Sequence, residues 1–560
     1  MLSHVVGPTT EPLLDFTIGE ALQRAARQWG DRPALIDRGQ HVRLTWRELE
    51  QRAAHLALGL NALGLQRGER IGIWSLNRYE WTITQYAAAR LGLILVTINP
   101  AYRAAELEYV LANAGCAALV LAPGFKSSDY IGMVRALLPE MEVAVSGRIQ
   151  SSRLPELRHV IQLGDDPANG ALAFAAVERR GAGLESAMLD EIAAQINVHD
   201  PACIQFTSGT TGSPKGVTLS HHNILNNAYF NGKILGFTAD DRVCLPLPLY
   251  HCFALTLGVL TCLAFGGSIV YPGEGFDPAA TLRAVDAERC TMLYGVPTMF
   301  IAQLEHPDFD TFDLSSLHGG IMGGSPCPLE VMRKVVDRMN MRDVTIAYGM
   351  TETSPVNFQS ATTDPLERRV STVGRVHPHA EAKIVDAQGN TVQRGSSGEI
   401  CIRGYLVMLG YWQAPEQTAL AVDEDGWMHT GDLGILDDEG YCNIVGRLKD
   451  MVIRGGENLY PREIEEFLYR HPAIRDVQVF GVPDNRFGEE LCAWIVLKTG
   501  ATLDETGLRA FCAGQIAHYK VPRYIRFVDD YPMTVTGKAQ KFLMRELMQE
   551  ELGLVAGLTA

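Results

Sequence analysis

The sequence predicts an α/β fold with a large N-terminal domain and a small, mobile α+β C-terminal domain. The N-terminal domain is expected to hold parallel-type sheets with helices and a barrel-like subdomain. The chain has 560 residues, more than a single hydrophobic core usually organises. Strand-length apolar runs alternate with helical patterns up to about residue 300. From about residue 374 the apolar runs become closely spaced and rich in glycine, and the pattern changes again after residue 451.

The first part of the chain alternates between helices and strands, which is typical of βαβ units and a parallel sheet. Apolar residues recur at helical spacing in the segments 18–29, 46–63, 80–91 and 104–114. Thr45 stands where its side chain can cap the second of these helices. Apolar runs of strand length lie at 70–74, 93–97 and 117–121.

A second alternating block begins at residue 203 and continues to residue 300. We expect a buried helix over 253–265, where the apolar run is continuous. Strands are expected on both sides of it, at 243–248, 267–271 and 292–294. The glycine-rich region 374–412 predicts the antiparallel, barrel-like subdomain.

The C-terminal part has a different pattern. Pro461 suits the first residue of a helix, and strand-like runs follow at 477–480 and 492–497. We place the domain boundary within residues 446–450. The chain then divides into an N-terminal domain, 1–448, and a mobile C-terminal domain, 449–560.

Composition restricts the partners and the location. A net charge of −16 argues against nucleic acid, because phosphate backbones require a basic surface. The 11 cysteines include no C-x-x-C pair, which argues against a disulfide framework and a structural zinc site. The side chains of the adjacent His221 and His222 would point in different directions on a helix, so this pair does not predict a metal site. With no signal peptide, transmembrane run or peroxisomal C-terminus, we expect the cytoplasm. The oligomeric state is not given by the sequence, and a homodimer is compatible with it.

A loop rich in glycine and hydroxyl side chains follows the apolar run 202–206. It consists of Thr207, Ser208, Gly209, Thr210, Thr211, Gly212, Ser213, Pro214 and Lys215. Its main-chain N–H groups can form an anion nest, its hydroxyls can donate hydrogen bonds, and Lys215 supplies a positive charge. Gly216 follows the lysine, so this is not a Walker A motif. Polyphosphate is the predicted ligand, and a flexible surface turn is the alternative.

Further motifs follow this loop in a fixed order. They are Tyr348-Gly-Met-Thr-Glu-Thr353, His429-Thr-Gly-Asp-Leu-Gly434, Gly446-Arg-Leu-Lys-Asp450, Gly455-Gly-Glu-Asn458 and Thr534-Val-Thr-Gly-Lys538. Together with the loop they resemble the adenylate-forming superfamily of acyl-CoA synthetases, luciferases and peptide-synthetase adenylation domains. The resemblance covers about residue 16 to about residue 548. It is greatest to medium-chain fatty acyl-CoA synthetases.

The resemblance implies an ATP site. The loop would hold the β- and γ-phosphates, and Tyr348 would offer a flat face to adenine. Asp432 would accept hydrogen bonds from both ribose hydroxyls, which suits a carboxylate with two oxygens. Arg447 would contact ribose or phosphate. The alternatives are a core tyrosine, an aspartate that closes a turn and a surface ion pair.

The resemblance also implies the catalytic groups of the adenylation step. Thr351 would donate to the α-phosphate, and Glu352 would be an oxygen ligand for Mg²⁺. Without the other motifs, a Thr-Glu pair is more often a helix start. Lys538 would place its ammonium between the substrate carboxylate and the α-phosphate, where negative charge develops.

For the second half-reaction, transfer to coenzyme A, the resemblance implies a rotation of the C-terminal domain. Lys449 occupies the hinge position of the superfamily, and an ordinary exposed lysine is the alternative. Gly455 and Gly456 would allow the pantetheine arm to approach the main chain closely, and a plain hairpin turn is the alternative.

Two absences restrict the acid. No Asp or Glu lies between residues 248 and 267, where amino-acid-activating relatives place a partner for the substrate ammonium. Gly349 occupies the position where acetate-activating relatives carry a tryptophan that closes the pocket, so we expect a deeper cavity. The expected lining is mostly apolar or small: His251, Phe253, Val296, Met299, Gly323, Gly324, Gly349, Met350 and Val356.

These observations predict an AMP-forming acid:thiol ligase that acts on a medium-chain fatty acid. Its partners would be the small-molecule carboxylic acid, ATP with Mg²⁺, and coenzyme A. An aryl- or branched-acid CoA ligase is the nearest alternative, and a non-catalytic adenylate-binding sensor is the alternative from another class. A luciferase is disfavoured by the greater likeness to the ligases. A peptide-synthetase module is disfavoured because no carrier domain follows.

Overall fold

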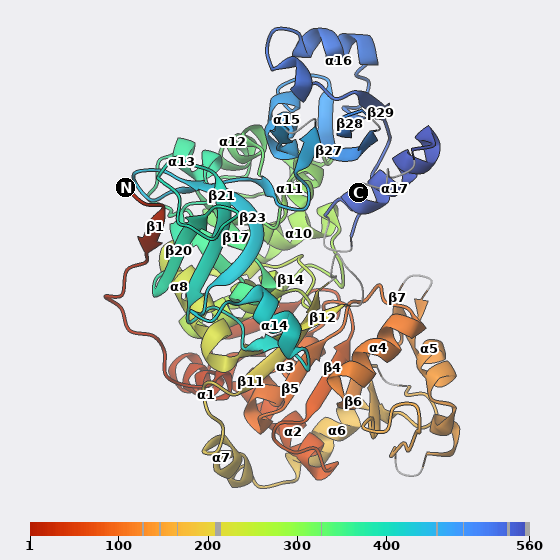
Figure 1. Cartoon of the computed structure of the whole chain (residues 1–560). Helices are drawn as coiled ribbons and strands as arrows, with labels where there is room; N and C mark the ends of the chain where they lie inside the picture. Colours follow the sequence, from red (N-terminus) through yellow and green to blue (C-terminus); the bar gives the residue numbers. More distant parts are fainter. Residues whose placement is uncertain are drawn as a thin grey trace.

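The computed structural model describes residues 1–125, 128–144, 147–164, 166–207, 214–325, 327–454, 457–484, 486–534 and 538–554, and only the main chain at 457 and 458. Two large sheets, a smaller antiparallel sheet and a separate C-terminal sheet organise this part of the chain (Figure 1). The predicted α/β class is confirmed.

The first large sheet has eight strands and supports the glycine-rich loop. Its order is β10 (Leu172–Ala173), β9 (His159–Gln162), β6 (Cys116–Leu121), β4 (Arg70–Trp74), β5 (Ile94–Thr97), β11 (Pro201–Thr207), β12 (Lys215–Ser220) and β22 (Gly410–Tyr411). The strands from β10 to β11 run parallel, whereas β12 and β22 join antiparallel. The loop predicted to bind phosphate therefore connects two hydrogen-bonded neighbours.

The second large sheet has nine strands. Its order is β19 (Arg375–Val376), β18 (Val356–Gln359), β17 (Asp343–Gly349), β16 (Gly319–Gly323), β15 (Met292–Gly295), β13 (Arg242–Cys244), β14 (Ser268–Tyr271), β2 (Pro33–Asp37) and β3 (Val42–Thr45). The strands from β17 to β2 are parallel, and the outer strands are antiparallel. The expected strand at 243–248 ends at Cys244, before the two prolines.

The glycine-rich region 374–412 is only partly the predicted antiparallel subdomain: β19 and β22 at its ends join the large sheets, and its two middle strands belong to a five-stranded antiparallel sheet. Its order is β1 (His4–Val6), β20 (Ala380–Val385), β21 (Gly398–Gly404), β23 (Met428–Leu436) and β24 (Cys442–Arg447). The N-terminal strand β1 thus pairs with a strand from much later in the chain. A two-stranded ribbon of β7 (Gly124–Phe125) and β8 (Ser128–Asp129) lies outside the sheets.

The C-terminal strands form their own sheet at the top of Figure 1. It contains β25 (Val452–Arg454), β26 (Glu457–Leu459), β27 (Ile474–Asp484), β28 (Gly488–Leu497) and β29 (Tyr524–Phe527). Its helices are α15 (Pro461–Leu468), α16 (Glu505–Cys512) and α17 (Lys541–Leu552). Two buried clusters here contain only residues from Val452 onward.

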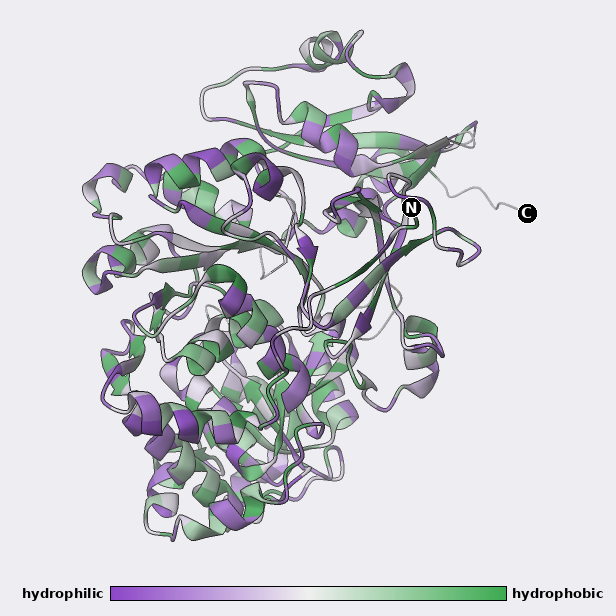
Figure 2. Cartoon of the chain, turned by 90° about the vertical axis from the view of Figure 1, so that its left-hand side faces the viewer, coloured by the Kyte–Doolittle hydropathy of each residue, from purple (hydrophilic) through white to green (hydrophobic). Residues whose placement is uncertain are grey.

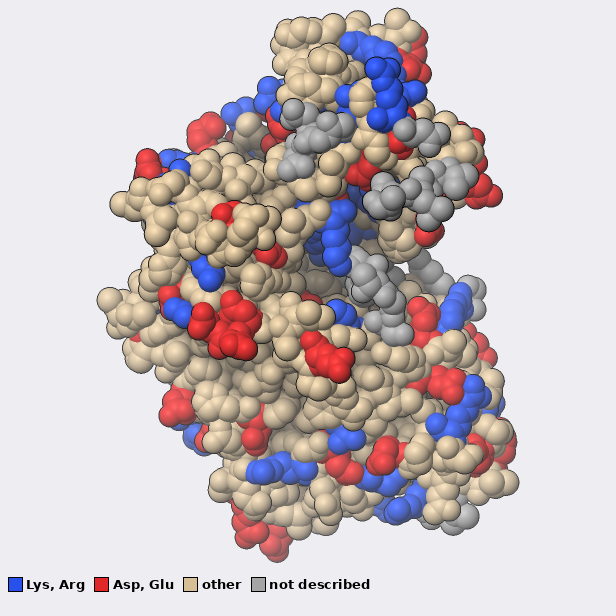
Figure 3. Space-filling model, in the orientation of Figure 1, with Lys and Arg blue, Asp and Glu red and all other residues tan. Residues whose placement is uncertain are grey.

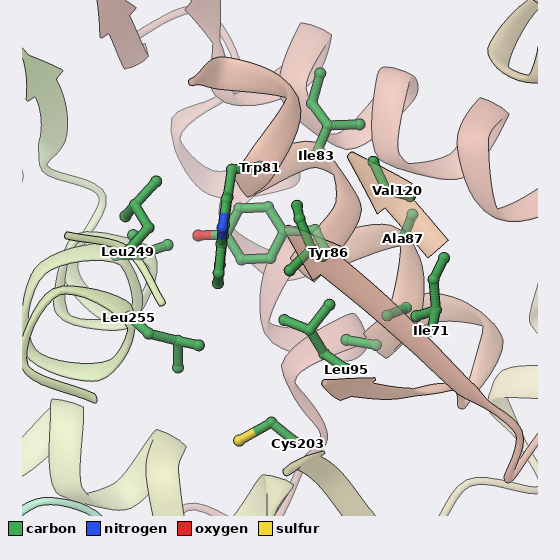
Figure 4. Close-up of a cluster of buried hydrophobic side chains, with 14 of the residues drawn as sticks. Ile71, Trp81, Ile83, Tyr86, Ala87, Leu95, Val120, Cys203, Leu249 and Leu255 are labelled. Atoms are coloured by element: carbon green, nitrogen blue, oxygen red, sulfur yellow. The ribbon is translucent and has the colours of Figure 1, made fainter. Parts of the chain in front are cut away.

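The four helices expected near the N-terminus are present. They are α1 (Ile18–Trp29), α2 (Trp46–Ala62), α3 (Tyr79–Leu91) and α4 (Ala104–Ala114). Thr17 and Thr45 cap α1 and α2 in capping boxes with Glu20 and Glu48. The side chains around the circumference of α3 are buried, and α3 contacts strands of both large sheets. Its Trp81 and Tyr86 lie in the core with Leu95 and Cys203 from the eight-stranded sheet (Figure 4).

The remaining α-helices lie in the connections between strands. They are α5 (Tyr130–Leu137), α6 (Phe174–Ala182), α7 (Ala187–Ala193), α8 (His221–Leu235), α9 (Thr261–Phe265), α10 (Pro278–Glu288), α11 (Pro297–Leu304), α12 (Leu329–Arg338), α13 (Leu366–Ser371) and α14 (Pro415–Ala421). The helix expected over 253–265 consists of a π-helical stretch, Phe253–Leu260, followed by α9. Polar residues mark the outer faces of many helices (Figure 2). No helix in the described part of the chain has the length and apolar character needed to cross a bilayer.

Candidate active site

An aspartate joins the nine-stranded sheet to the antiparallel sheet. The hydroxyl of Tyr348, at the end of β17, donates to Oδ2 of Asp432 at 2.6 Å. On the adjacent strand, Nε of Arg447 donates to Oδ1 of the same carboxylate at 3.1 Å. Asp432 and Arg447 are direct partners in the β23–β24 register, which explains the ion pair. Burial and the neighbouring Asp432 raise the pKa of Tyr348, and Asp432 raises the pKa of Arg447.

The residues predicted for the α-phosphate and the metal lie in a short 3₁₀ turn directly after β17. This turn spans Thr351–Thr353, and both Thr351 and Glu352 are buried. The hydroxyl of Thr351 lies 3.5 Å from the Cys252 sulfur. Burial raises the pKa of Glu352 above its usual value. A buried carboxylate of this kind is costly to ionise alone, and a cation beside it offsets that cost.

Glu352 is held by the edge of the eight-stranded sheet. The hydroxyl of Tyr411, on β22, donates to Oε1 of Glu352 at 3.0 Å. The ammonium of Lys215, on β12, lies 4.9 Å from the centre of the Tyr411 ring. Tyr411 therefore connects the predicted metal ligand with the lysine of the glycine-rich loop. Charged Lys215 and Arg447 both favour the ionised form of Glu352.

Lys538 reaches this site from the C-terminal part of the chain. Its main chain is fixed by two hydrogen bonds with Thr534, at 2.8 and 2.9 Å. Its Cε lies 3.9 Å from the position that a Cβ on Gly324 would occupy, at the end of β16. Burial, with the nearby Arg447, lowers the pKa of Lys538, and the acidic groups of Asp432 and Glu352 partly oppose this shift. Lys538 is partly buried, and its charge interacts with those of Arg447, Asp432 and Glu352.

Predicted residues of the acyl pocket gather next to Lys538. The buried Phe253, Val296, Met299 and Val356 belong to one hydrophobic cluster, against which Met350 packs. A Cβ on Gly323 would lie 3.7 Å from the Phe253 ring, and one on Gly324 would lie 3.2 Å from Val296. The Phe253 ring also stacks on Tyr294, with 6.3 Å between the ring centres.

His251 contacts the cluster through Phe253 and interacts electrostatically with Lys538. Its Nδ1 accepts the N–H of Phe253 at 3.2 Å, so the proton of the neutral ring is on Nε2. Burial, together with the charge of Lys538, lowers the pKa of His251 to about 3. The imidazole is therefore neutral near pH 7 and adds no charge to an apolar pocket.

Comparison with known proteins identifies the family. The model of the family described as AMP-binding enzyme matches residues 22–412, and that of the AMP-binding enzyme C-terminal domain matches residues 463–538. The chain belongs to the AMP-binding enzyme family. The predicted superfamily is confirmed by these matches.

Individual relatives align with this AMP-binding enzyme over nearly its whole length. The chain is 47% identical over 555 residues to the mitochondrial medium-chain acyl-CoA ligase ACSF2 of Danio rerio, and the alignment covers 99% of this chain and 91% of the relative. The anthranilate CoA ligase AuaEII, solved with anthranoyl-AMP, superposes with a TM-score of 0.85 at 26% identity, covering 97% of this chain and 99% of the other. ATP-bound MatB from Rhodopseudomonas palustris has a TM-score of 0.80 at 30% identity, covering 96% and 100%.

Some predicted residues of the AMP-binding enzyme cannot be placed at the site. Ser208, Gly209, Thr210, Thr211, Gly212 and Ser213 of the loop, and Gly455 and Gly456, lie outside the described residues. The two ends of the loop are described: Thr207 and Lys215 are paired across β11 and β12, and the Tyr109 hydroxyl donates to the Pro214 carbonyl at 3.1 Å. Lys449 is exposed in the turn between β24 and β25.

One interpretation of the sequence was wrong. We expected the missing side chain of Gly349 to leave the acyl channel open. A Cβ at this position would instead lie 1.8 Å from the carbonyl oxygen of Pro355. Gly349 sits at an irregularity in the β17–β18 pairing, where the main chain of Pro355 fills the space. The glycine thus permits a close main-chain approach, and a larger residue would displace the turn that carries Thr351.

Two contacting residues were missed by the sequence reasoning. Cys252, which contacts Thr351, lies between His251 and Phe253, and only these two neighbours were predicted for the site. Tyr411 belongs to no motif that was singled out. Nothing in the sequence indicates that Tyr411 lies near Lys215, because β22 and β12 are far apart in the chain and come together only by strand pairing.

We predict that Tyr411→Phe weakens metal-nucleotide binding. The substitution removes the hydrogen bond to the Glu352 carboxylate, and such charge-assisted bonds contribute about 1.5–3 kcal/mol. The Mg²⁺ concentration for half-maximal pyrophosphate release at fixed ATP should rise by about tenfold or more. Tyr441→Phe is the matched control, because that hydroxyl donates to Asp364 at 2.7 Å in another pair. If Tyr411→Phe and wild type need the same Mg²⁺ concentration for half-maximal pyrophosphate release, the Tyr411 hydroxyl does not position Glu352 for metal binding.

Proposed function

We propose that this chain is an ATP-dependent acyl-CoA synthetase that activates a medium-chain fatty acid. The carboxylate would attack the α-phosphorus of ATP, forming an acyl-adenylate as the bond to pyrophosphate breaks. The thiol of coenzyme A would then attack the acyl carbon and release AMP. The observation that carries the proposal is the position of the Lys538 side chain: its Cε lies 3.9 Å from a Cβ built on Gly324, beside which Val296 of the apolar cluster packs, and its charge interacts with Glu352.

The groups around Lys538 suit the charge that the adenylation step develops. A buried ammonium interacts more strongly with a developing oxyanion than it would in water, because less solvent screens it. The Thr351 hydroxyl can donate a hydrogen bond to the α-phosphate of ATP. Asp432 would hold the ribose, with Tyr348 beside the adenine. A Mg²⁺ ion bound at Glu352 would neutralise phosphate charge.

The apolar pocket and the relatives support a fatty acid as substrate. The chain is nearly half identical to a protein named as a medium-chain acyl-CoA ligase. Phe253, Val296, Met299 and Val356 are buried together in one hydrophobic cluster. An aromatic acid is the second candidate: the structural neighbour AuaEII holds anthranoyl-AMP, and the stacked Phe253 and Tyr294 rings could contact an aryl group.

The second half-reaction would use a rotation of residues 449–560 as a mobile C-terminal domain. In the present arrangement Lys538 faces the N-terminal part, which suits adenylation. A rotation about Lys449 would withdraw Lys538 and bring Gly455 and Gly456 toward the adenylate. The recess between the C-terminal sheet and the remainder of the molecule contains Lys and Arg side chains (Figure 3), which suit polyanionic substrates.

The cytoplasm is our proposed location, and a homodimer the proposed assembly to test. All 11 cysteines are free, as expected in a reducing compartment. We propose no nucleic-acid partner, because the net charge is −16.

Lys538→Ala should abolish adenylation while sparing thioester formation from supplied acyl-AMP. Loss of one electrostatic donor costs roughly 10²-fold or more in rate. The two half-reactions are measured as pyrophosphate release and as CoA thioester formation. Lys498→Ala, whose exposed lysine bonds the Pro472 carbonyl, is the control. Equal loss in both half-reactions would refute the proposed role.

The pH dependence of wild-type adenylation gives a second test of Lys538. Burial lowers the pKa of its ammonium, so the ammonium loses its proton at a lower pH than a free lysine, whose pKa is about 10.4. The rate of adenylation should therefore begin to fall, as the pH is raised, before the pH reaches that value.

Lys449→Pro should have the opposite effect. Proline fixes φ and would hinder the rotation, so adenylation should persist while thioester formation falls by roughly tenfold or more. Lys449→Ala retains a flexible main chain and is the matched control. If the proline variant loses both half-reactions in proportion, the substitution disturbs folding and the hinge proposal fails.

Phe253→Leu should shift preference toward longer acids. The smaller side chain enlarges the pocket beside Gly323, and each additional buried methylene favours the longer acid by about 0.8 kcal/mol, roughly fourfold. The measurement is the ratio of kcat/KM for dodecanoate to that for octanoate. Phe237→Leu, a buried phenylalanine that packs against Phe265, controls for loss of core packing. An unchanged ratio would show that the acyl chain does not contact Phe253.

A further inference from the structure

A second group of potential metal ligands lies on the antiparallel sheet, separate from Glu352. Among the residues that the structure describes, Glu399, Cys401 and His429 place one carboxylate oxygen, one sulfur and one imidazole nitrogen within 4.8 Å of one another. Cys401 on β21 and His429 on β23 are direct partners in the sheet register. The pairing is irregular between Glu399 and Cys401 on β21, and Oε2 of Glu399 reaches Nδ1 of His429 across it.

The spacing of these atoms fits a tetrahedral cation. Nδ1 of His429 lies 3.5 Å from the Cys401 sulfur and 2.9 Å from Oε2 of Glu399. Zinc with Zn–S of about 2.3 Å and Zn–N of about 2.0 Å separates the two ligand atoms by about 3.5 Å at a tetrahedral angle. The sulfur and nitrogen need no rearrangement, and the carboxylate oxygen would move away from the imidazole by about 0.5 Å.

The surroundings orient the ligands. Nε2 of His429 lies 3.7 Å from Oδ2 of Asp423, on the side away from the cluster, as a carboxylate beside a metal-bound histidine does. Oε1 of Glu399 accepts the N–H of Gly431 at 3.0 Å, which leaves Oε2 for the cluster. The His429 side chain is 34% exposed and that of Glu399 19%, so water can supply a fourth ligand.

We propose that Glu399, Cys401 and His429 bind Zn²⁺, and that bound Zn²⁺ inhibits the enzyme. A thiolate with an imidazole selects zinc over the hard Mg²⁺ ion, which prefers oxygen. The inhibition would follow from Glu399: the shift of about 0.5 Å that its carboxylate makes away from the imidazole would disturb its bond to the N–H of Gly431, which precedes Asp432. This coupling depends on the proposed ribose contact of Asp432, whereas the binding of Zn²⁺ does not.

The binding test uses Co²⁺ as a spectroscopic substitute for Zn²⁺ in the full-length protein. Wild type should show a thiolate-to-cobalt charge-transfer band and the visible bands of tetrahedral Co²⁺, and Zn²⁺ should abolish them. Cys401→Ser should remove the charge-transfer band, and His429→Gln should weaken Zn²⁺ binding roughly tenfold or more in calorimetry. Cys327→Ser, at a cysteine that is not fully buried, is the matched control and should retain the spectrum. If wild-type protein with Co²⁺ shows no charge-transfer band, the proposed metal site is wrong. This result does not depend on whether the variants fold.

The inhibition test measures the KM for ATP in pyrophosphate release with and without Zn²⁺ at saturating Mg²⁺. Zn²⁺ should raise this KM severalfold in wild type and in Cys327→Ser, but not in Cys401→Ser. Zinc binding that leaves the KM unchanged would overturn the inhibitory role. If adenylation itself is absent in wild type, the proposed function fails, while the cobalt spectrum still decides the site.

Discussion

The Asp432 carboxylate is the contact on which the arrangement of the site depends. One of its oxygens accepts from Tyr348 on the nine-stranded sheet and the other accepts from Arg447 on the neighbouring antiparallel strand. Without this carboxylate, the end of β17 and the antiparallel sheet would lose a shared polar anchor. The 3₁₀ turn with Thr351 and Glu352 follows directly on β17, so its position relative to the antiparallel sheet depends on the same contact.

A second constraint is electrostatic. The site gathers the cationic groups Arg447, Lys215 and Lys538 around the carboxylates Asp432 and Glu352. Burial opposes the charged forms of both Lys538 and Glu352, so each depends on opposite charge nearby. A polyphosphate with its metal would add charge of both signs to this group. The site is therefore suited to binding ATP and metal together.

Local features of the sequence predicted local structure well. The helices α1 and α2 were recognisable from their apolar spacing, and for α2 the capping residue Thr45 agrees with it. The contacts between Tyr411 and Glu352 and between Cys401 and His429 could not be predicted, because they depend on which strands pair across long separations. The absence of C-x-x-C spacing disfavoured a structural zinc site, but such spacing reports only ligands close in sequence. Gly349 was misread for a related reason, since the space beside a glycine is decided by whatever packs there, here Pro355.

The late position of Lys538 in the chain has a consequence for synthesis on the ribosome. Tyr348, Thr351, Glu352, Asp432 and Arg447 all precede it, and N-terminal domains generally fold first as a chain emerges. Under the proposed roles of these residues, an unfinished chain would contain the groups that hold nucleotide and acid yet would lack the ammonium that drives their reaction. Nascent molecules that lack Lys538 would then spend no ATP on reactive adenylates, and activity would begin only after Lys538 has been made and has entered the site.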